Sequence, residues 1–562
     1  MAKHAKISRW IILGLAFFGA AALGLTGQSA ANFFSPASDL VQNSATDLYK
    51  HPKIDSTLCN LIHVFRSQGF AAMKSMAEGL HIDFSGDLLR VTVVSAGANT
   101  GSAASAAIPR LAQVISSSGG RVETSFRNDV QSLLPIDAIL PLAGEAQVSR
   151  IRLPLKPRTC AYTSEGVYKT GADSWQNLTP FHSPEAVKVA ILDLGFTDYQ
   201  NLLGTELPAS VTARSFRSDG RMDTNVHGTA CAEIVHDMAP DAELYLVNFS
   251  TDTEQHLAVE WMISQGIDII SYSIAWTNAG DGKGTGPITY DVERATAAGI
   301  VWCGAAGNDA RVHWEATFND SNGNGYHNFP DNDEFLEFTV PAQETASVMM
   351  NWDDWGAWNG YDYSGSANDY DLSLYVKSGG SWAPLWDSAN LQNGAGSWPV
   401  EESGVMNNSA SSVTIGVRIR KYSATRNCQM EIFVWGINGP IEYNVPGGSL
   451  AIPADSPHGI ALGASDAISD TYHSYSSRGP THDGRIKPDF AAPSGVSGQT
   501  YGSYGFYGTS ASTPHMAGAF ALFKTKTPFT LQQIRNLITS RALDLGDPGA
   551  DNKFGKGRLK LR

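Results

Sequence analysis

Short apolar runs rich in β-branched residues alternate with amphipathic stretches between residues 187 and 304. The apolar runs predict strands at 187–194, 243–249, 267–275 and 300–304, and the amphipathic stretches predict helices at 227–238, 254–265 and 290–298. Apolar runs without polar alternation are typical of parallel strands that are covered on both faces. We therefore expect a doubly wound α/β sheet, whose active site belongs at the carboxyl ends of the strands.

The pattern before this region predicts a smaller α+β unit. Residues 32–87 look helical and polar, and they suggest no chemistry. The following stretch predicts strands at 89–94, 121–126, 130–134 and 148–153, with helices around 108–115 and at 136–144. This βαββαβ order predicts a ferredoxin-like unit.

A third sequence pattern extends from about residue 311 to residue 445. It contains many Asn, Gly, Ser and Trp residues and no convincing helical pattern, and its clearest strands are predicted at 347–352, 370–376, 412–420 and 429–435. Several short strands of this kind suggest a β-sandwich. The α/β pattern resumes at Ile460 and ends in helices that begin near Ser510 and Thr530.

Composition and charge narrow the class of protein. With 42% hydrophobic and 17% charged residues, the composition is that of a globular protein. The 55 acidic and 40 basic residues give a formal net charge of −15, and no long basic run could follow a phosphate backbone. We therefore expect no nucleic-acid partner. The five cysteines are too scattered to form a disulfide framework.

The first residues carry a three-part export pattern. The basic residues Lys3, Lys6 and Arg9 precede an apolar run over 10–25, and small residues follow. We predict a signal peptide at 1–31 and a secreted or periplasmic location, with an uncleaved membrane anchor as the alternative.

The stretch from Gly508 to Gly518 combines a candidate nucleophile with the start of a helix. Ser510 follows a glycine and opens a run of small residues, so its hydroxyl is expected at the positive end of a helix dipole. Pro514 is expected in the first turn, where an amide has no helical partner. Developing negative charge is favoured at such a position, which suits a nucleophilic serine.

Three further polar residues lie at the ends of predicted elements. Asp193 ends the buried run VAILD, His227 begins the helical stretch HGTACA, and Asn308 follows a strand in GAAGND. A buried aspartate can hold a histidine in one tautomer, and a histidine can take a serine proton and return it to a leaving amine. An asparagine amide can stabilise an oxyanion. Each residue taken alone also has an ordinary explanation as a turn or capping residue.

Together, these motifs resemble those of the subtilisin-like serine proteases, or subtilases. The chain order Asp, His, Ser is that of subtilisin and differs from the orders of chymotrypsin and the α/β-hydrolases. The resemblance implies that Ser510 is the nucleophile, His227 the base and then the acid, Asp193 its orienting partner, and Asn308 an oxyanion donor beside the Ser510 amide. One departure is Leu194, where the family usually has a small hydroxyl residue.

Spacing supports an insertion between the histidine and the serine. The interval from His227 to Ser510 exceeds that of subtilisin by roughly 126 residues, which matches the β-rich segment.

The resemblance also implies a substrate-binding surface. The strand that would pair with substrate contains Ser273, Ile274 and Ala275, and the floor of the pocket would be formed by Gly304, Ala305 and Ala306. Both segments lack acidic residues, so we expect an apolar or broad preference and not a preference for basic residues.

A domain division follows from the resemblance. The α+β unit resembles the family's prodomain, an intramolecular chaperone and inhibitor, so we expect self-cleavage between about residues 154 and 186. The predicted division is a signal peptide at 1–31, a prodomain at 32–160, a catalytic domain at 161–310 and 446–562, and an inserted β-sandwich at 311–445. The implied partners are protein or peptide substrates and the chain's own prodomain, on a monomeric enzyme.

The inserted segment also contains a candidate calcium loop. Asp320, Asn322 and Asn324 fit the pattern D-x-[DN]-x-[DN]-G, and Asp331 stands at the twelfth position. Two asparagines replace acids and no helices flank the loop, so an ordinary Asn/Gly turn is the alternative. The chemistry itself requires no cofactor, and a calcium ion here would be structural.

Two other functions fit part of the pattern. A non-catalytic protein could bind a surface or glycan through the β-rich insert, although all four catalytic positions are present. A transpeptidase or macrocyclase would use the same acyl-enzyme but pass the acyl group to an amine in place of water.

Overall fold

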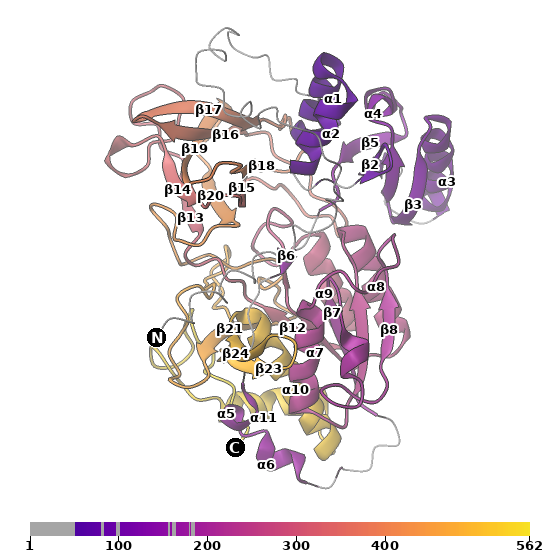
Figure 1. Cartoon of the computed structure of the whole chain (residues 1–562), viewed down its shortest axis with the longest axis vertical. Helices are drawn as coiled ribbons and strands as arrows, with labels where there is room; N and C mark the ends of the chain where they lie inside the picture. Colours follow the sequence, from indigo (N-terminus) through magenta and orange to yellow (C-terminus); the bar gives the residue numbers. More distant parts are fainter. Residues whose placement is uncertain are drawn as a thin grey trace. The chain divides into compact units, whose positions relative to one another are not determined.

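The computed structural model describes residues 51–79, 82, 84–96, 102–155, 158–159, 165–178, 180 and 186–562. The predicted signal peptide at 1–31 lies outside the described residues. Residues from 49 onward belong to one compact unit. Many of its elements are labelled in Figure 1, and the larger hydrophobic cores lie in an amino-terminal α+β domain, an α/β domain and a β-sandwich.

A seven-stranded parallel sheet forms the centre of the α/β domain. Its strand order is β22-β21-β12-β10-β7-β9-β8, and each neighbouring pair is parallel. The strands are β7 (Lys188–Asp193), β8 (Thr212–Ser215), β9 (Glu243–Asn248), β10 (Ile269–Tyr272), β12 (Val301–Ala305), β21 (Ile460–Asp466) and β22 (Phe490–Ser494). The last two strands follow the β-rich segment in sequence, so one sheet contains strands from both sides of it.

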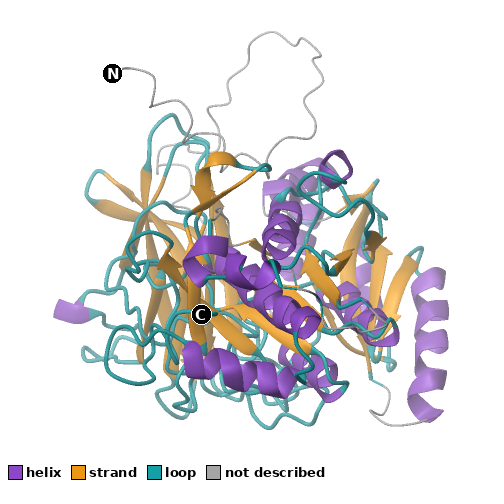
Figure 2. Ribbon diagram, turned by 90° about the horizontal axis from the view of Figure 1, so that it is seen from below, coloured by secondary structure: helices purple, strands orange, loops and turns teal. Residues whose placement is uncertain are grey.

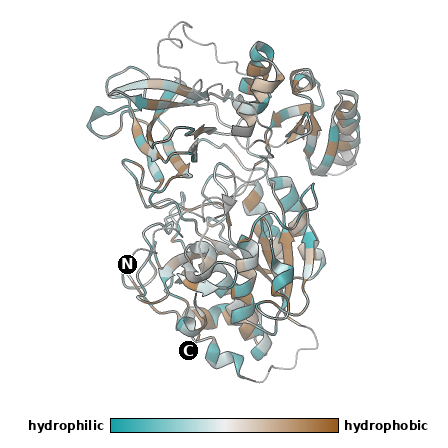
Figure 3. Ribbon diagram, in the orientation of Figure 1, coloured by the Kyte–Doolittle hydropathy of each residue, from teal (hydrophilic) through white to brown (hydrophobic). Residues whose placement is uncertain are grey.

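Alternating residues of these strands enter two different cores. In β7, Val189 and Ile191 lie in the core with α7 (His227–Met238) and α10 (Thr509–Lys526), whereas Ala190 and Leu192 lie in the core with α8 (Asp252–Ser264) and α9 (Pro287–Ala297). Side chains alternate across a strand, so both faces of β7 are covered, which explains the continuous apolar run. Figure 3 shows the hydrophobic colouring of these strands. The predicted doubly wound α/β fold is confirmed.

The remaining elements of the α/β domain surround this sheet, and Figure 2 distinguishes its helices from its strands. The helices are α5 (Val167–Thr170), α6 (Asp173–Gln176), α7 (His227–Met238), α8 (Asp252–Ser264), α9 (Pro287–Ala297), α10 (Thr509–Lys526), α11 (Leu531–Arg541) and the 3₁₀ helix η2 (Tyr199–Leu202). The short strands are β11 (Ile274–Ala275), β23 (Val496–Gly498) and β24 (Gly502–Phe506), and β6 (Arg158–Thr159), which follows the amino-terminal domain in sequence, pairs with β11. The stretch 267–275, predicted as one strand, is divided between β10 and β11.

The amino-terminal domain is built on an antiparallel sheet with the order β5-β2-β4-β3, and β1 pairs with β2. Its elements are α1 (Ser56–Gln68), α2 (Phe70–Gly79), β1 (Phe84–Ser85), β2 (Leu88–Ser95), α3 (Ser102–Ser117), β3 (Arg121–Phe126), β4 (Asp129–Leu134), α4 (Ile136–Ala143) and β5 (Val148–Arg152). Elements β2 to β5 follow the βαββαβ order, and α1 packs into the same core.

The β-rich segment contains two four-stranded antiparallel sheets, with the orders β13-β20-β15-β18 and β14-β19-β16-β17. The strands are β13 (His313–Thr317), β14 (Leu336–Val340), β15 (Thr345–Trp352), β16 (Asp369–Ser378), β17 (Ser381–Ser388), β18 (Val400–Met406), β19 (Val413–Ser423) and β20 (Gln429–Trp435), with a short 3₁₀ helix η3 (Pro330–Asn332). Residues of both sheets share one hydrophobic core, as in a β-sandwich.

Within the described ranges, we find no helix that combines the length and apolar character needed to cross a membrane.

Candidate active site

The predicted catalytic residues come from the carboxyl ends of the sheet and from the two helices that start beside it. Asp193 is the last residue of β7, His227 is the first residue of α7, and Ser510 is the second residue of α10. Asn308 follows β12. Parallel strands bring their carboxyl ends to one edge, so residues far apart in sequence meet there.

His227 and Asp193 form a buried pair. The Nδ1 atom of His227 lies 2.8 Å from Oδ2 of Asp193, and neither side chain has exposed surface. Oδ1 of Asp193 accepts a hydrogen bond from the Leu194 amide at 2.8 Å, and the His227 amide donates to the Asn225 side chain at 2.8 Å. With Nδ1 facing the carboxylate, Nε2 is the ring nitrogen available for proton transfer. Leu194 thus contributes its backbone amide, and this hydrogen bond does not depend on the identity of its side chain.

Gly228 permits the close approach of α7 to β7. A Cβ atom at this position would lie 2.5 Å from the Gly195 carbonyl oxygen and 2.9 Å from Cβ of Asp193. Such contacts are shorter than van der Waals packing allows. The glycine after the histidine therefore sets the distance between helix and strand that the His227–Asp193 hydrogen bond needs.

Pro514 lies inside α10 and not in its first turn, so that prediction was wrong. A proline has no amide hydrogen and cannot donate to the carbonyl four residues earlier, which here is that of Ser510. The Ser510 carbonyl instead accepts a hydrogen bond from the Ser273 hydroxyl at 2.9 Å, and the Cys231 thiol lies 3.8 Å from it. The Ser510 hydroxyl in turn donates to the Ser273 carbonyl at 3.3 Å. These two hydrogen bonds join the start of α10 to Ser273, which lies between β10 and β11.

Asn308 is oriented by a residue that the sequence analysis missed. Its Oδ1 atom accepts hydrogen bonds from the Thr509 amide at 3.0 Å and from the Thr509 hydroxyl at 3.1 Å. The Gly307 amide donates to the same hydroxyl at 3.2 Å. Because the carbonyl end of the Asn308 amide is occupied, its NH₂ end is left to face away from Thr509. The only sequence signal is the position of Thr509 directly before Ser510.

The predicted substrate strand is paired with another part of the chain. In β11, Ile274 and Ala275 pair antiparallel with Thr159 and Arg158 of β6. Ser273, directly before β11, is the residue whose carbonyl accepts from Ser510. An extended segment added to β11 therefore has one end directed toward Ser510.

The other predicted substrate residues lie at the end of β12. Gly304 and Ala305 are its last two residues, and Ala306 follows, with all three buried. Ala306 packs in a small apolar group with Leu450, and its carbonyl accepts a hydrogen bond from the Ala451 amide at 2.9 Å. The structure thus places this segment against residues that follow the β-sandwich in sequence.

Two other titratable side chains near the serine are held uncharged. Burial raises the pKa of the Cys231 thiol well above its usual value, and the charge of Asp193 adds to this effect. Burial lowers the pKa of His515 to about 4, and its Nδ1 lies 2.7 Å from the Ala511 carbonyl oxygen. The ligand atoms of Cys231, Asp193 and His227 lie within 4.8 Å of one another, as a metal site would require. Because Asp193 and His227 are already hydrogen-bonded to each other, the arrangement suits proton transfer.

The candidate calcium loop is closed by a different acid from the one predicted. Oxygens of Asp320 accept hydrogen bonds from the Asn324 and Gly325 amides at 3.0 and 2.9 Å. The side-chain amides of Asn322 and Asn324 both donate to Glu334. Glu334 also pairs with an arginine, Arg418.

Asp331 belongs to η3, where its backbone is left-handed with φ of 61°. Among the described contacts, none joins its side chain to Asp320, Asn322 or Asn324. The described loop therefore gathers three of the four predicted residues.

Comparisons with known proteins identify the family. The family described as "Subtilase family" matches residues 185–350 and 391–557. Bacillopeptidase F of Bacillus subtilis (strain 168) is 34% identical over 131 residues, which are 21% of this chain and 9% of that protein. Subtilisin E of the same strain is 37% identical over 115 residues, which are 20% of this chain and 28% of that protein. The matches therefore span well under half of these two relatives.

A solved structure, the CspB protease of Clostridium perfringens, is similar with a TM-score of 0.48 and 16% identity over 70% of this chain and 97% of that chain. The family match covers more than half of the chain and contains the Asp193, His227, Asn308 and Ser510 motifs. On this basis the chain belongs to the subtilase family of serine peptidases.

Proposed function

We propose that this protein is an endopeptidase that hydrolyses peptide bonds of proteins or peptides through an acyl-enzyme on Ser510. The observation that carries the proposal is the fully buried 2.8 Å contact between His227 Nδ1 and Asp193 Oδ2, beside the helix that begins with the serine. This contact is the part of a catalytic triad that fixes the histidine tautomer.

The proposed reaction has two halves. Ser510 Oγ attacks the scissile carbonyl carbon while Nε2 of His227 takes the hydroxyl proton, and the same nitrogen then gives that proton to the leaving amine. In the second half, water attacks the acyl-enzyme while Nε2 of His227 takes its proton. The return of that proton to Ser510 Oγ releases the carboxylate product. Asp193 orients His227 and stabilises the histidinium that forms in each half.

Asn308 is the proposed oxyanion donor, together with the Ser510 amide. The two hydrogen bonds from Thr509 to Oδ1 support this role, because they leave the NH₂ end of the side chain for another acceptor. A donor that is already oriented needs no reorganisation when negative charge develops on the substrate oxygen.

The catalytic assignment is tested by replacing the nucleophile. Ser510→Ala should reduce kcat by a factor on the order of 10⁶ and abolish labelling by a fluorophosphonate, because triad residues act as a unit. Ser540→Ala, on the exposed side of α11, is the matched control and should keep both properties. Undiminished casein cleavage by Ser510→Ala would refute the assignment. Product masses from a peptide with a free amino terminus distinguish hydrolysis from transpeptidation.

We also propose that the amino-terminal domain is a prodomain that the enzyme removes from itself. The antiparallel pairing of β6 with β11 supports this, since residues 158–159 already occupy the strand position next to Ser273. The chain direction from Arg158 to Thr159 leads toward the Ser510 end of that strand. We infer that the scissile bond lies within residues 160–164.

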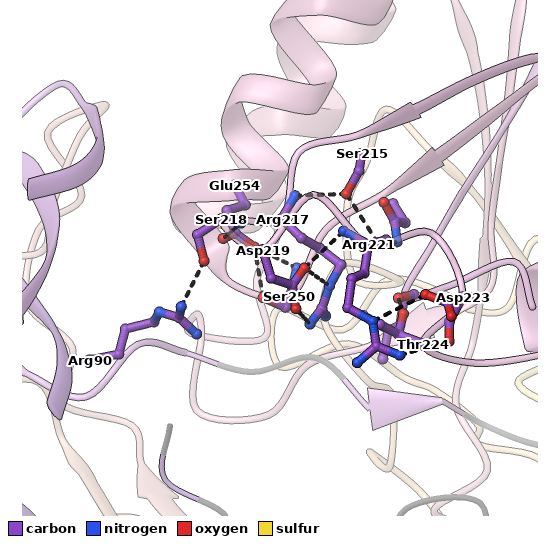
Figure 4. Close-up of polar contacts among 12 residues, drawn as sticks. Arg90, Ser215, Arg217, Ser218, Asp219, Arg221, Asp223, Thr224, Ser250 and Glu254 are labelled. Atoms are coloured by element: carbon purple, nitrogen blue, oxygen red, sulfur yellow. Dashed lines mark hydrogen bonds and ion pairs between the residues drawn. The ribbon is translucent and has the colours of Figure 1, made fainter. Parts of the chain in front are cut away.

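Contacts between the amino-terminal domain and α8 support an inhibitory role. Gln131 of β4 accepts from the Thr251 hydroxyl at 2.6 Å and donates to Glu254 at 3.2 Å. The Arg90 guanidinium of β2 donates to the Ser218 hydroxyl at 2.7 Å, as Figure 4 shows. The Glu254 carboxylate also accepts from the Ser218 amide at 2.8 Å, so Glu254 connects both contacts. The sheet of the amino-terminal domain is thus held at the amino-terminal end of α8.

Self-processing is tested with the full chain in a host that lacks other proteases. The wild type should lose the residues up to about 160–164, and amino-terminal sequencing of the product should locate the cut. Ser510→Ala should accumulate as the intact precursor. Equal processing of both proteins would assign the scission to another enzyme.

Export and ion binding complete the proposal. The pattern of residues 1–31 supports passage across a membrane, and a precursor that is inactive until export would protect the host. We propose no cofactor for the chemistry and a monomeric enzyme. We propose a structural calcium ion at the loop of Asp320, Asn322 and Asn324, whose oxygen donors suit that ion, with Glu334 as the closing acid.

A further inference from the structure

The β-sandwich presents an aromatic cluster to the amino-terminal domain. Trp355, Tyr363 and Trp398 are buried against one another, and Trp358 packs on them. Leu155, which follows the last strand of the amino-terminal domain, packs on the same group. We call residues 355–363 and 396–398 the aromatic clamp. Its aromatic rings and carbonyl groups are the kind of surface that binds arginine side chains.

Arg127 stands in a strained turn that points to a binding role. It follows β3 in the two-residue connection to β4, and its φ is 51°. Glycine, asparagine or aspartate is favoured where a hairpin turn needs positive φ, and other residues there are disfavoured by contact of Cβ with the backbone. Residues in such conformations are retained when contacts elsewhere over-determine them. The long cationic side chain of Arg127 makes contacts that a glycine could not.

The contacts of Arg127 join the sandwich and the α/β domain. Its guanidinium donates to the Gly360 carbonyl of the clamp at 3.0 Å and to the Tyr290 hydroxyl of α9 at 2.5 Å. The guanidinium carbon lies 4.3 Å from the centre of the Tyr290 ring and 5.6 Å from that of Tyr361. The next amide, that of Asn128, donates to the Tyr361 hydroxyl at 2.9 Å. The tip of this hairpin is therefore held from two sides.

A second arginine contacts the same clamp. Arg150 of β5 donates to the Gly396 carbonyl at 3.0 Å, and its guanidinium carbon lies 5.0 Å from the centre of the Trp398 ring. Its Nη2 atom lies 4.0 Å from the carboxylate of Asp362. Both arginines come from the end of the domain's sheet where β3 turns into β4 and β5 pairs with β2.

Helix α1 makes a separate contact with the sandwich. The Ser56 amide donates to the Asn390 side chain, and the Ser56 hydroxyl lies 3.2 Å from that of Ser388 at the end of β17. Asn60, one turn later, donates to the Asp387 carbonyl at 3.4 Å. The amino-terminal domain therefore contacts the sandwich through its sheet and through its first helix.

We propose that the inserted sandwich is a second docking surface for the prodomain, centred on the aromatic clamp and its two arginine partners. The proposal rests on the proposed self-processing function and extends it to the step after scission. While the chain is intact, the linker supplies a high effective concentration and the extra contacts are redundant. Once the linker is cut, only non-covalent contacts retain the prodomain. The clamp then delays its release and so delays the onset of activity.

The test follows processing and activity separately in the full chain. Arg127→Gly removes the guanidinium and suits the positive φ, and Arg150→Gln removes the charge, whereas Arg121→Gln alters an exposed arginine of β3 as a matched control. Gel electrophoresis measures scission, and a fluorogenic peptide measures the lag from scission to full activity. Loss of one hydrogen bond typically weakens a binding equilibrium constant about fivefold, here that of the prodomain for the enzyme. Each single variant should therefore shorten the lag about fivefold, and the double variant should shorten it more. The control should match the wild type.

A change on the sandwich side makes the test independent of the hairpin. Tyr361→Phe keeps the ring but removes the hydroxyl that accepts from the Asn128 amide, so it should also shorten the lag severalfold. Size-exclusion chromatography of the freshly cut protein should show less prodomain fragment with the enzyme in Arg127→Gly, Arg150→Gln and Tyr361→Phe than in the wild type. Wild-type lag and retention in these variants would overturn the proposal. A wild-type chain that is never cut would instead refute self-processing, so the two failures are distinguishable.

Discussion

At the scale of single residues, Thr509 and Pro514 orient groups beside Ser510 without being assigned a chemical step. Thr509 holds the carbonyl end of the Asn308 side chain, and Pro514 leaves the Ser510 carbonyl to the Ser273 hydroxyl. Neither residue has chemistry of its own to contribute. Both orient groups that the proposed reaction uses, since a preorganised donor stabilises charge without moving first.

Removal of Asn308, the proposed oxyanion donor, should affect turnover and not substrate binding. Asn308→Ala should lower kcat by roughly 10²–10³, as for the equivalent donor in a subtilisin, and leave KM nearly unchanged. Thr509→Val removes only one of the two hydrogen bonds to Oδ1 and should give a smaller loss. The matched control is Thr513→Val, which should keep full kcat, since the Thr513 hydroxyl only donates to the Thr509 carbonyl one turn earlier. Steady-state kinetics with a peptide substrate checks this order, and equal kcat for Asn308→Ala and wild type would contradict it.

At the scale of elements, the loop between β13 and β14 illustrates how folding changes a linear motif. The sequence pattern predicts Asp331 as the last calcium ligand, but η3 intervenes, and Glu334 accepts the two asparagine amides. Carboxylate position in a loop depends on the turns between the ligands, which a fixed spacing does not record.

Calcium at this loop predicts a response to chelation that depends on Glu334. EDTA should lower the Tm of the Ser510→Ala precursor, and added calcium should restore it, because an ion that binds only the folded state stabilises that state. Glu334→Gln should remove this response, whereas Asp331→Asn should keep it. Differential scanning calorimetry of the three proteins is the measurement. An unchanged Tm on chelation would show that hydrogen bonds and the Arg418–Glu334 pair alone close the loop.

At the scale of the whole molecule, ion pairs connect parts that are distant in sequence. Arg152 of the amino-terminal domain contacts Asp252 at the start of α8 and lies 2.8 Å from Asp129 of its own sheet. Burial raises the pKa of Asp129, although the charge of Arg152 opposes this shift. Loss of the arginine would leave two carboxylates close together with little access to solvent.

Arg152→Leu should therefore destabilise the precursor by about 3–5 kcal/mol, the usual cost of breaking a buried ion pair. Arg152→Leu combined with Asp252→Asn should recover part of this loss, because the most buried unpaired charge is removed. Urea unfolding of the Ser510→Ala precursor measures both. If Arg152→Leu alone had the same free energy of unfolding as its parent, this contact would contribute nothing to the docking of the domain.

A histidine and a glutamate connect the sandwich to the α/β domain and should make stability depend on pH. Nε2 of His482 lies 3.4 Å from Oε1 of Glu431, which also lies 3.1 Å from Nε2 of His313. Burial disfavours the charged form of His482, but the Glu431 carboxylate outweighs burial and raises its pKa to about 10. Glu315 contributes in the same direction.

A raised histidine pKa stabilises the folded state fully below the unfolded value near 6.5, and this contribution is lost as pH rises toward 10. The Tm of the Ser510→Ala precursor should therefore fall over that window. His482→Gln should have a lower Tm at pH 6 and a flatter profile, whereas a change at the exposed His458 should leave the profile intact. Parallel profiles for His482→Gln and its parent would contradict the assignment.

The sequence by itself determined the α/β fold and selected the residues now proposed for catalysis. The β7 run reads as a buried parallel strand because both faces of the sheet are covered, so its side chains need no polar alternation. Asp193, His227 and Ser510 are recognisable because each stands in a local motif at the end of an element. Their contacts could be expected from the rule that active sites lie at the carboxyl ends of parallel strands.

Only the tertiary structure decided the contacts that depend on distant segments. The pairing of β6 with β11, the orientation of Asn308 by Thr509 and the contacts of Arg127 each join residues far apart in the chain. No local period encodes such contacts, because they follow from how whole elements pack once the sheet has formed. In the sequence alone, Arg127 is an ordinary turn residue. Its positive φ and its aromatic partners become visible only after three parts of the chain have come together.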